Sequence, residues 1–249
     1  MKRLLYILVF LASVSGIAQN SLLFEQGKER YKEEKYQEAI DSWMKILENG
    51  EHSANLYFNL GNAHYKLNNV GPSIYYYEKA AQLSPLDRDI KTNLAFAENS
   101  RIDAIEPLPK TIFSKWYTTI ATQFTFDGWA LLAVLFSGLF SILFLGYYFA
   151  GAEQKKRLFF TTAIICGCLF VLVFTMASVS YKDLQKNVFA IVFSEATDVK
   201  SEPKTNSDTI FVIHEGTKVQ LLETDGLWTH VAIVNGVEGW MPSAELKKL

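Results

Sequence analysis

Two long apolar runs without a charged residue dominate the hydropathy pattern of the chain. The first lies between Gly128 and Ala152 and the second between Leu158 and Tyr181. A helix needs about 20 residues to cross about 30 Å of hydrocarbon, so each run is long enough to span a membrane. Phe and Leu occupy every side of a helix drawn through the first run, without the polar stripe of a soluble helix. We therefore predict transmembrane helices at residues 128–151 and 158–181, rather than a buried hairpin inside a soluble core.

Three adjacent basic residues, Lys155, Lys156 and Arg157, lie in the short segment between the two runs. Lys and Arg of short loops are retained on the cytoplasmic side of a membrane. We therefore predict a cytoplasmic turn at residues 152–157, with the chain before and after the hairpin on the other side. Both soluble parts are therefore predicted to lie outside the cytoplasm.

The first 18 residues have the pattern of a cleaved secretory signal peptide. Lys2 and Arg3 precede the apolar stretch Leu4–Val14, which is too short to span a membrane comfortably. Gly16 and Ala18 then supply the small residues that a signal peptidase recognises. We predict cleavage after Ala18. Export of the following segment agrees with the side that the basic turn predicts.

Residues 20–87 repeat with a period of 34 residues. The recurring positions are Gly27 and Gly61, Tyr31 and Tyr65, Lys32 and Lys66, Ile40 and Ile74, and Trp43 and Tyr77. This pattern resembles the tetratricopeptide repeat, a helix–turn–helix unit of the same length. The resemblance implies repeats at residues 20–53 and 54–87 and a capping helix at residues 88–104 that covers the last apolar face. Short arrays of this family are platforms for docking a partner.

The resemblance also implies a partner-binding groove lined by the first helix of each repeat. In register with the repeat, the residues expected to face this groove are Phe24, Lys28, Tyr31, Phe58, Asn62, Tyr65 and Lys66. Core packing is the alternative for the tyrosines of this set. His64 stands at an aromatic position of the repeat, so we expect it to pack rather than to bind a ligand.

Between the repeats and the first apolar run, residues 110–126 have an amphipathic pattern. The apolar residues Ile112, Phe113, Trp116, Tyr117, Ile120 and Phe124 recur at helical spacing. Aromatic residues on one side of a short helix suit the headgroup level of a bilayer. We predict an interfacial amphipathic helix, and a soluble helix packed on the repeats is the alternative.

The chain after the hairpin, residues 188–249, changes to strand patterning. β-Branched and aromatic residues gather in the stretches Val188–Phe193, Thr209–Ile213, Lys218–Leu222, Trp228–Val234 and Gly239–Met241. Turn residues separate these stretches, and Asn235-Gly236 is typical of a tight hairpin turn. Five or six short strands are therefore expected, which predicts a small all-β barrel.

Four short motifs in this segment have the order and spacing of a bacterial SH3 domain, which the segment resembles. They are Asp198-Val199-Lys200-Ser201, Gly216-Thr217-Lys218-Val219, Trp228 and Gly239-Trp240. The resemblance implies that Gly216, Trp228, Gly239 and Trp240 are signature residues and that the ligand is a cell-wall peptide or a protein segment. We expect Trp228 and Trp240 to pack in the core and rim of the barrel, with ligand contact as the alternative.

Composition and charge set several classes of function aside. The formal net charge is −2, and the soluble parts offer no basic patch for nucleic acid. The histidines, His52, His64, His214 and His230, have no ligand spacing, and the sequence contains no phosphate-binding loop or catalytic motif. Both apolar runs lack the ionisable residues that mark transport pathways. We therefore predict that the protein is not an enzyme and has no cofactor or metal site.

The two cysteines, Cys166 and Cys168, both lie in the second apolar run. Two residues apart on a helix, their side chains point about 200° away from each other and do not form a disulfide together. Packing as small apolar residues is the favoured interpretation. A thiol-redox role is an alternative that rests on these two residues alone.

The order of the modules resembles the BatE-like proteins of the Bacteroides aerotolerance operon over the entire chain. The predicted fold class is a multidomain membrane protein with an all-α repeat domain, a two-helix hairpin and a small all-β SH3-like barrel. The resemblance implies partners that carry von Willebrand type A domains and a link to oxygen tolerance or envelope stress. It also implies a bacterial inner membrane, crossed twice, with both soluble parts in the periplasm. We hypothesise a non-catalytic inner-membrane scaffold, and the runner-up is a peptidoglycan-binding sensor that signals through the hairpin.

Overall fold

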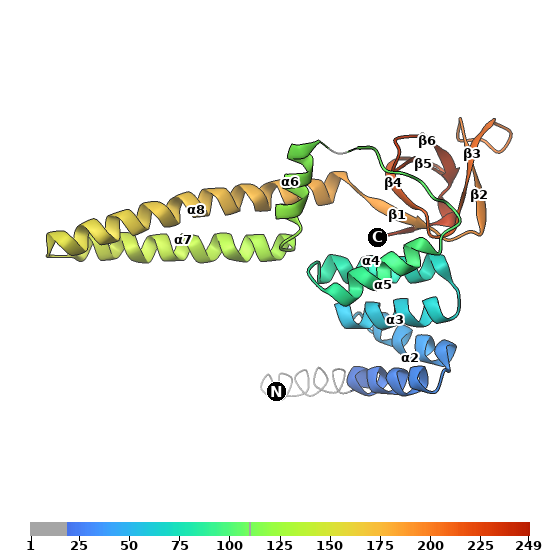
Figure 1. Ribbon diagram of the computed structural model, residues 1–249, viewed down its shortest axis with the longest axis horizontal. Helices are drawn as coiled ribbons and strands as arrows, with labels where there is room; N and C mark the ends of the chain where they lie inside the picture. The colour runs from blue at the N-terminus through green and yellow to red at the C-terminus, as the bar shows by residue number, and fades with distance from the viewer. Residues whose placement is uncertain (1–18, 110) are drawn as a thin grey trace, which may run out of the picture. The chain divides into compact units, whose positions relative to one another are not determined.

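The computed structural model describes residues 19–109 and 111–249, so the predicted signal peptide lies outside the described residues. The described chain forms two compact units (Figure 1). The first, here called the composite unit, joins the described residues before Pro109 to Phe189–Leu249. The second, the hairpin unit, is Pro109–Val188. The predicted fold class is confirmed, because helices precede two long apolar helices and an antiparallel sheet follows them.

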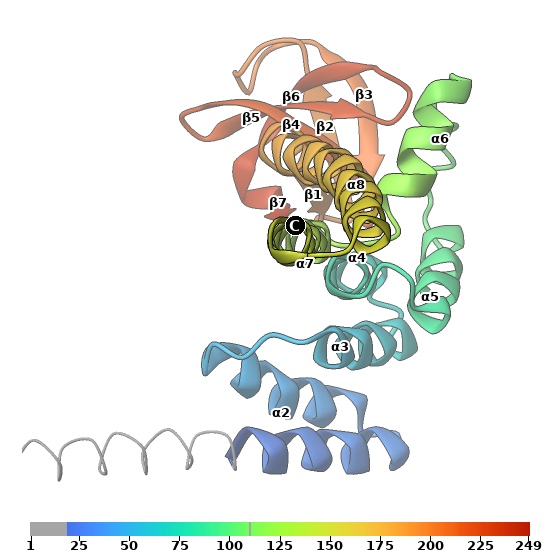
Figure 2. The ribbon, with the colours of Figure 1, turned by 90° about the vertical axis from the view of Figure 1, so that its left-hand side faces the viewer.

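The repeat region of the composite unit consists of helices joined by short turns. They are residues 19–32, α2 (Tyr36–Glu48), α3 (Ala54–Lys66), α4 (Val70–Leu83) and α5 (Arg88–Asn99). Figure 2 shows α2, α3 and α4 in successive layers. The Ser53 hydroxyl accepts a hydrogen bond from the Leu56 N–H at 3.2 Å and caps α3, and the Asp87 carboxylate caps α5 in the same way.

The repeat period reflects a contact between a glycine of one helix and an aromatic ring of the next. A Cβ atom on Gly27 would lie 2.2 Å from Nε1 of Trp43, and one on Gly61 would lie 2.6 Å from Cδ1 of Tyr77. Trp43 and Tyr77 are each 1% exposed, so neither ring has space to move aside. Glycine is therefore required at both positions for the paired helices to approach this closely.

The C-terminal part of the composite unit is a seven-stranded antiparallel sheet. Its strands are β1 (Phe189–Val192), β2 (Ala196–Lys200), β3 (Thr209–His214), β4 (Lys218–Asp225), β5 (Trp228–Ile233), β6 (Glu238–Pro242) and β7 (Leu246–Lys248), with the short 3₁₀ helix η1 (Ser243–Glu245) before β7. The spatial order is β3-β2-β6-β5-β4-β1-β7. Alternate residues of β5 point into the core, so Thr229, Val231 and Ile233 are buried.

Two strands of this sheet, β2 and β7, are absent from the predicted stretches. In β2, the polar residues Thr197 and Asp198 hide the apolar alternation, and Thr197 is itself buried. In β7, three residues with two lysines carry almost no strand signal. Both segments become strands because a neighbour pairs with them: β3 and β6 pair with β2, and β1 pairs with β7.

The hairpin unit consists of α6 (Ile112–Ala121), α7 (Phe126–Phe149) and α8 (Glu153–Lys186). Helices α7 and α8 are long and apolar enough to cross a membrane, with mean hydropathies of 2.2 and 2.5 in their most apolar parts. Most of their apolar side chains are exposed in the described structure. The two helices pack along each other through apolar side chains, among them the buried Trp129, Ala133, Val173 and Ala177.

The predicted spans 128–151 and 158–181 correspond to α7 and α8 with shifted bounds, and two further predicted segments are shorter in the structure. The predicted turn at residues 152–157 is shorter, because α8 begins at Glu153 and takes up Lys155, Lys156 and Arg157. Residues 153–157 are good helix formers, whereas Gly151 favours the break. The predicted amphipathic helix at residues 110–126 is also shorter, since α6 ends at Ala121 and the Thr125 hydroxyl caps the start of α7.

Candidate partner-binding surfaces

The predicted groove residues on α3 divide into packed and exposed side chains. Phe58 is half-buried, and its ring centroid lies 5.9 Å from that of Tyr77. Tyr65 is 41% exposed, and Lys66 is also exposed. Phe96, one repeat period after Asn62, is 57% exposed on α5. The groove prediction omitted Phe96, which continuing the period into the third partial copy would have found.

The Asn62 side chain is engaged in hydrogen bonds within the repeat region and is not free for a partner. Its Oδ1 accepts a hydrogen bond from the Tyr77 hydroxyl at 2.6 Å and another from Nδ2 of Asn93 at 2.9 Å. The side chain therefore joins α3 to α4 and α5. Burial raises the pKa of the Tyr77 hydroxyl well above its usual value, so Tyr77 remains a hydrogen-bond donor. We assign Asn62 a structural role in joining these three helices.

On the first helix, the predicted groove residues pack mainly against their own repeat. Phe24 and Tyr31 have ring centroids 6.5 Å and 6.2 Å from that of Trp43. Lys28 pairs with Glu25 at 3.0 Å, and its Nζ also lies 5.9 Å from the Phe24 ring centroid. The clearly exposed aromatic side chains, Tyr65 and Phe96, therefore lie on α3 and α5.

His64 lies inside the second repeat. Its ring stacks on Tyr76 with centroids 5.4 Å apart, and its Nδ1 lies 3.3 Å from Nδ2 of Asn69. Burial lowers the pKa of His64 to about 4, because the charged imidazolium would lose its hydration. The imidazole is therefore neutral at physiological pH and serves as a packed aromatic ring.

A cleft of about 480 Å³ opens on the barrel between β2, the β2–β3 loop, and the ends of β5 and β6. Its lining residues are Ala196, Thr197, Asp198, Lys200, Thr205, Val212, Trp228, Pro242 and Glu245. Trp228 supplies an aromatic wall, and the other members bring two carboxylates and one ammonium group. The cleft therefore combines an apolar surface with charges of both signs.

The charged groups of this cleft are held in place by hydrogen bonds. Nζ of Lys200 lies 3.0 Å from Oδ2 of Asp198 and donates to the Thr209 hydroxyl at 2.8 Å. The hydrogen bond from Lys200 lowers the pKa of Asp198. The Glu245 carboxylate accepts hydrogen bonds from the hydroxyls of Ser194 and Thr197. These bonds order the side chains in the cleft, and ordered side chains lose little further entropy when another group packs against them.

Of the four SH3 signature residues, only Trp228 lines the cleft. Trp240 stacks on His230 with ring centroids 4.9 Å apart and lies in the half-buried rim. Gly239 is a packing position, because a Cβ atom there would lie 2.5 Å from Cγ1 of Val199. Gly216 has φ +81° and faces the repeats, where a Cβ atom would lie 2.8 Å from Cδ1 of Ile74. The structure thus separates residues that the sequence grouped as one signature.

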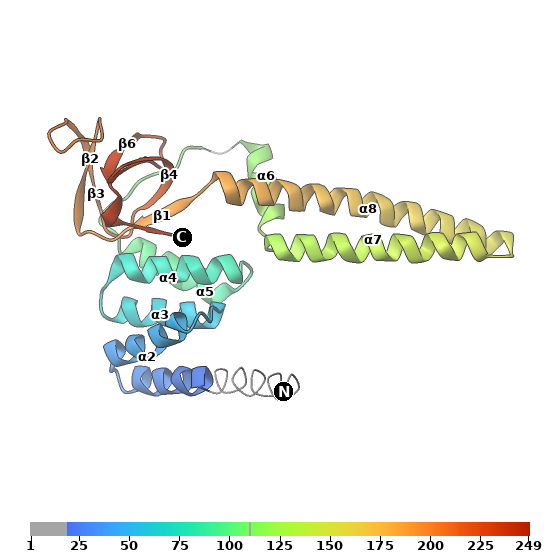
Figure 3. The ribbon, with the colours of Figure 1, turned by 180° about the vertical axis from the view of Figure 1, so that it is seen from behind.

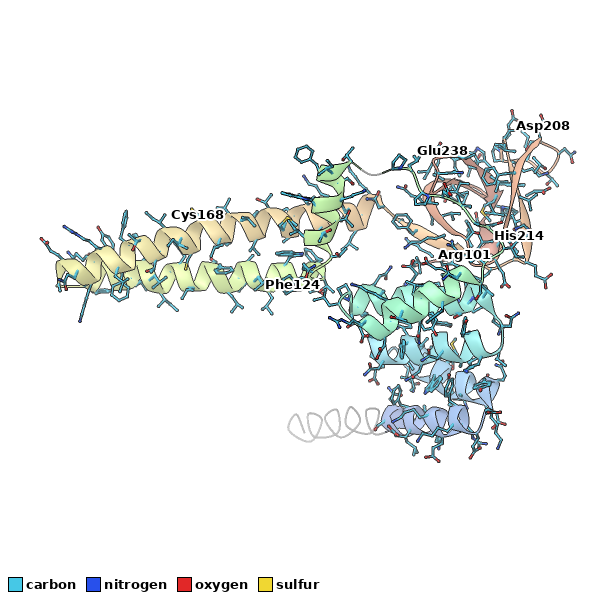
Figure 4. All side chains as sticks on the ribbon, viewed as in Figure 1. Arg101, Phe124, Cys168, Asp208, His214 and Glu238 are labelled. Carbon is cyan, nitrogen blue, oxygen red and sulfur yellow. The ribbon has the colours of Figure 1, made fainter. Side chains whose placement is uncertain are left out.

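The barrel and the repeats are joined by Asp103, which follows α5. Its Oδ2 accepts hydrogen bonds from the backbone N–H of His214 and from the Thr217 hydroxyl, each at 2.7 Å. Its Oδ1 lies 2.7 Å from Nδ1 of His214. Burial by itself would raise the pKa of Asp103, but the hydrogen bonds from Thr217 and His214 outweigh it and the pKa is lowered. Figure 4 shows His214 at the edge of the barrel beside Arg101.

An ion pair and a backbone contact extend this junction along α4. Nζ of Lys218 lies 2.7 Å from Oε1 of Glu78, whose side chain is 12% exposed. The backbone N–H of Gly71 donates to Oε2 of Glu215 at 3.3 Å. Both pairs join residues more than 100 positions apart in the chain. None of these contacts was predicted.

Apolar packing completes the junction between the repeats and the barrel. Ile191 of β1 is fully buried and belongs to the hydrophobic core of the helices, with Phe193 and Leu249 packed against the same core. The Phe193 ring meets Tyr75 at a centroid distance of 5.7 Å, and Nζ of Lys247 lies over both rings. Figure 3 shows the C-terminus beside α4. The barrel therefore covers a face of the last repeat helix that would otherwise be exposed to water.

The two cysteines of α8 are both free, with Cys166 buried and Cys168 exposed. Figure 4 shows Cys168 on α8 within the hairpin. Among residues 19–109 and 111–249, no group of three or more His, Cys, Asp or Glu side chains is placed to hold a metal ion.

Comparison with known proteins supports the assignment of both soluble modules. Residues 54–87 match the tetratricopeptide repeat family, and these residues contain α3 and α4. Residues 195–247 match the bacterial SH3 domain family, from just before β2 into β7. None of the curated proteins compared with the chain matches it. The chain thus combines a tetratricopeptide repeat, two apolar helices and a bacterial SH3 domain, and both soluble modules are of typically non-catalytic interaction families.

Proposed function

We propose that the protein is a non-catalytic scaffold of the bacterial inner membrane that presents its repeats and its SH3-type barrel to partners as one periplasmic body. The junction at Asp103, Glu78 and Ile191 supports this proposal best. It packs chain from before the hairpin against chain from after it, and this requires both segments to be on the same side of the membrane. Two spans satisfy that requirement, and Lys155, Lys156 and Arg157 favour the periplasm for the composite unit.

The partners in this proposal are membrane proteins of the same operon that carry von Willebrand type A domains. This part of the proposal rests on the resemblance of the module order to BatE-like proteins, which also connects the protein to oxygen tolerance or envelope stress. The exposed side chains of Tyr65 and Phe96 offer an aromatic surface for a protein segment. Aromatic side chains contribute large contact areas to interfaces with little loss of side-chain entropy.

Co-purification from solubilised membranes tests the scaffold. We expect the tagged chain to recover protein partners, and a double Tyr65→Ala, Phe96→Ala variant to recover much less of them. Lys91→Ala, which changes an exposed residue of α5, is the matched control and should behave like the unchanged protein. Recovery of cell-wall fragments alone, without a protein partner, would contradict the scaffold.

Reporter fusions test the orientation of the hairpin independently. A reporter inserted at Gln154 should be active only in the cytoplasm, and one placed after Leu249 only in the periplasm. The opposite pattern would overturn the assignment. If both reporters were active on the same side, α8 would not cross the membrane between Gln154 and Leu249, which would contradict the two-span arrangement itself.

A second candidate function, a peptidoglycan-binding sensor, is favoured by the cleft beside Trp228. Peptidoglycan stem peptides carry amino and carboxyl groups, and the cleft offers the carboxylates of Asp198 and Glu245 beside the Lys200 ammonium group. Charged groups of both signs could therefore pair with such a ligand while Trp228 packs against its apolar part.

Sedimentation of the detergent-solubilised full chain with purified peptidoglycan tests the sensor. The full chain is used because removal of the repeats would expose Ile191 and Phe193 of the barrel. We expect Trp228→Phe and Asp198→Ala to reduce the bound fraction if the cleft binds the wall. Asp208→Ala, in the β2–β3 loop beyond the cleft lining, is the control. Equal binding by all variants would exclude the cleft as the wall-binding site.

A further inference from the structure

Helix α6 has three distinct sides. The side toward the hairpin carries Tyr117, which is half-buried. A second side carries polar residues, among them the exposed Lys115 and Thr119. The third side is apolar and uncovered, with Ile112, Phe113, Trp116 and Ile120 exposed by 74%, 85%, 70% and 48%. Four neighbouring large apolar side chains on ten residues form a patch that water solvates poorly.

Two hydrogen bonds fix the level of α6 along the hairpin. The Tyr117 hydroxyl donates to Oδ2 of Asp183 at 2.5 Å, and the Trp129 indole donates from Nε1 to the Ala121 carbonyl at 3.2 Å. Burial and the Asp183 carboxylate together raise the pKa of Tyr117 to about 12, so the hydroxyl stays protonated and keeps its donor role.

These contacts lie at the end of the hairpin where its apolar surface stops. Asp183 is the second residue after Tyr181, the last residue of the uncharged run, and is thus about 3 Å beyond it along α8. Trp129 is in the first turn of α7. Phe124 in the turn between α6 and α7 packs edge to face on Trp129, with ring centroids 5.0 Å apart. Figure 4 marks Phe124 at this point.

We infer that α6 is an in-plane membrane anchor, with Ile112, Phe113, Trp116 and Ile120 inserted at the boundary between headgroups and acyl chains of the bilayer that the hairpin spans. The apolar patch continues the apolar surface of the hairpin at the level where lipid gives way to water. Lys115 and Thr119 on the adjacent side face the headgroups and water. Helices with this division of residues lie in the interface plane, and Trp and Tyr are enriched there.

The inference rests on the hairpin spanning a membrane, which belongs to the proposed function, so the test includes a separate control for the hairpin. Single cysteines are introduced into the full chain after Cys166→Ser and Cys168→Ser, at Trp116→Cys for the apolar patch and Thr119→Cys for the polar side. Leu139→Cys, 44% exposed in α7, reports on the hairpin. Each variant is labelled with an environment-sensitive fluorophore and reconstituted in phosphatidylcholine nanodiscs.

Two quenchers then place each fluorophore: a nitroxide on the lipid acyl chain, and iodide in water. We expect the label at 116 to lose most of its emission to lipid nitroxide near the headgroup and to be shielded from iodide, with the reverse at 119. The label at 139 should respond to nitroxide deep in the bilayer. A label at Phe113→Cys repeats the test if the change at Trp116 disturbs α6.

Three outcomes contradict the inference in different ways. Quenching of the 116 label by iodide alone would place the patch in water. Shielding of that label from both quenchers would show that protein, either this chain or a second copy, covers the patch. If the 139 label also fails to respond to lipid nitroxide, the hairpin itself is not in the bilayer and the membrane part of the proposed function fails. A normal response at 139 with failure at 116 refutes the anchor alone.

Discussion

The junction between the repeats and the barrel makes Asp103 the most informative residue to change. Asp103→Ala removes the acceptor of hydrogen bonds from Thr217 and from two groups of His214. The Asp103 side chain is only 13% exposed and Thr217 is 1% exposed, so water does not fully replace the lost carboxylate. A hydrogen bond to a charged group contributes about 1.5–3 kcal/mol, and partial rehydration of His214 reduces the sum. We expect the junction to weaken by about 2–4 kcal/mol.

Hydrogen exchange of the full chain in detergent measures this loss. A weakening of about 2 kcal/mol corresponds to exchange about 30-fold faster wherever opening of the junction limits the rate. The reporting amides lie in α4, in β1 and in the turn between β3 and β4. They include Gly71, whose N–H donates to the Glu215 carboxylate, and Gly216 of that turn, whose N–H donates to the Val192 carbonyl. Amides of α2 and the hairpin should keep their exchange rates.

Two control variants separate charge from shape. Asp103→Asn keeps the size and one acceptor oxygen, so its effect should be intermediate. Glu106→Ala changes an exposed acidic residue of the same segment and should leave exchange unchanged. If Asp103→Ala exchanges like the unchanged protein in α4 and β1, Asp103 does not hold the two modules together as a single body.

Three further predictions follow from the same structure. Gly61→Ala should lower the free energy of unfolding by about 1–3 kcal/mol because the new methyl group overlaps the Tyr77 ring; urea unfolding checks this, with Asn55→Ala on the exposed side of α3 as the control. Burial lowers the pKa of His64 from 6.5 to about 4, so between these pH values the unfolded chain binds a proton at His64 and the folded chain does not. The free energy of unfolding should therefore fall by up to about 3 kcal/mol as the pH drops from 6.5 to 4. Thermal unfolding at a series of pH values checks this, and His64→Gln should abolish this part of the pH dependence. A variant with both Cys166→Ser and Cys168→Ser should recover as much partner protein in co-purification as the unchanged chain, and it should support the same oxygen tolerance in cells.

Each of these predictions has a result that contradicts it. Equal unfolding curves for Gly61→Ala and Asn55→Ala would show that the helices separate without loss. An unchanged pH slope in His64→Gln would assign the titration to another group. Asp103 is not that group, because its pKa is lowered from 3.8 and its contribution to stability is lost only at more acidic pH. Loss of activity in the double Ser variant would revive the thiol-redox hypothesis.

The sequence predicted those features that depend on residues close together in the chain, namely the membrane spans and the repeats. The spans are visible because a membrane helix needs a continuous apolar run, and Gly128–Ala152 provides one. The repeats are visible because a glycine must face an aromatic ring in both copies, Gly27 with Trp43 and Gly61 with Tyr77, so the period is preserved in the chain itself. Local patterns were less reliable at boundaries: α8 begins at Glu153 because residues 153–157 favour a helix, although their charge is typical of a loop.

Only the tertiary structure decided how the soluble modules become one body and which residues form their surfaces. Asp103 and His214 are 111 positions apart with the whole hairpin between them, so no local pattern connects them. Ile191 was expected as a residue of the barrel, yet its side chain completes the core of the helices. Trp228 and Gly216 belong to one family signature, but the fold places them on different surfaces. Trp228 lines the cleft, whereas Gly216 packs against Ile74 of the repeats. The sequence specifies each module through short-range spacing, and the contacts between modules depend on surfaces that exist only after both have folded.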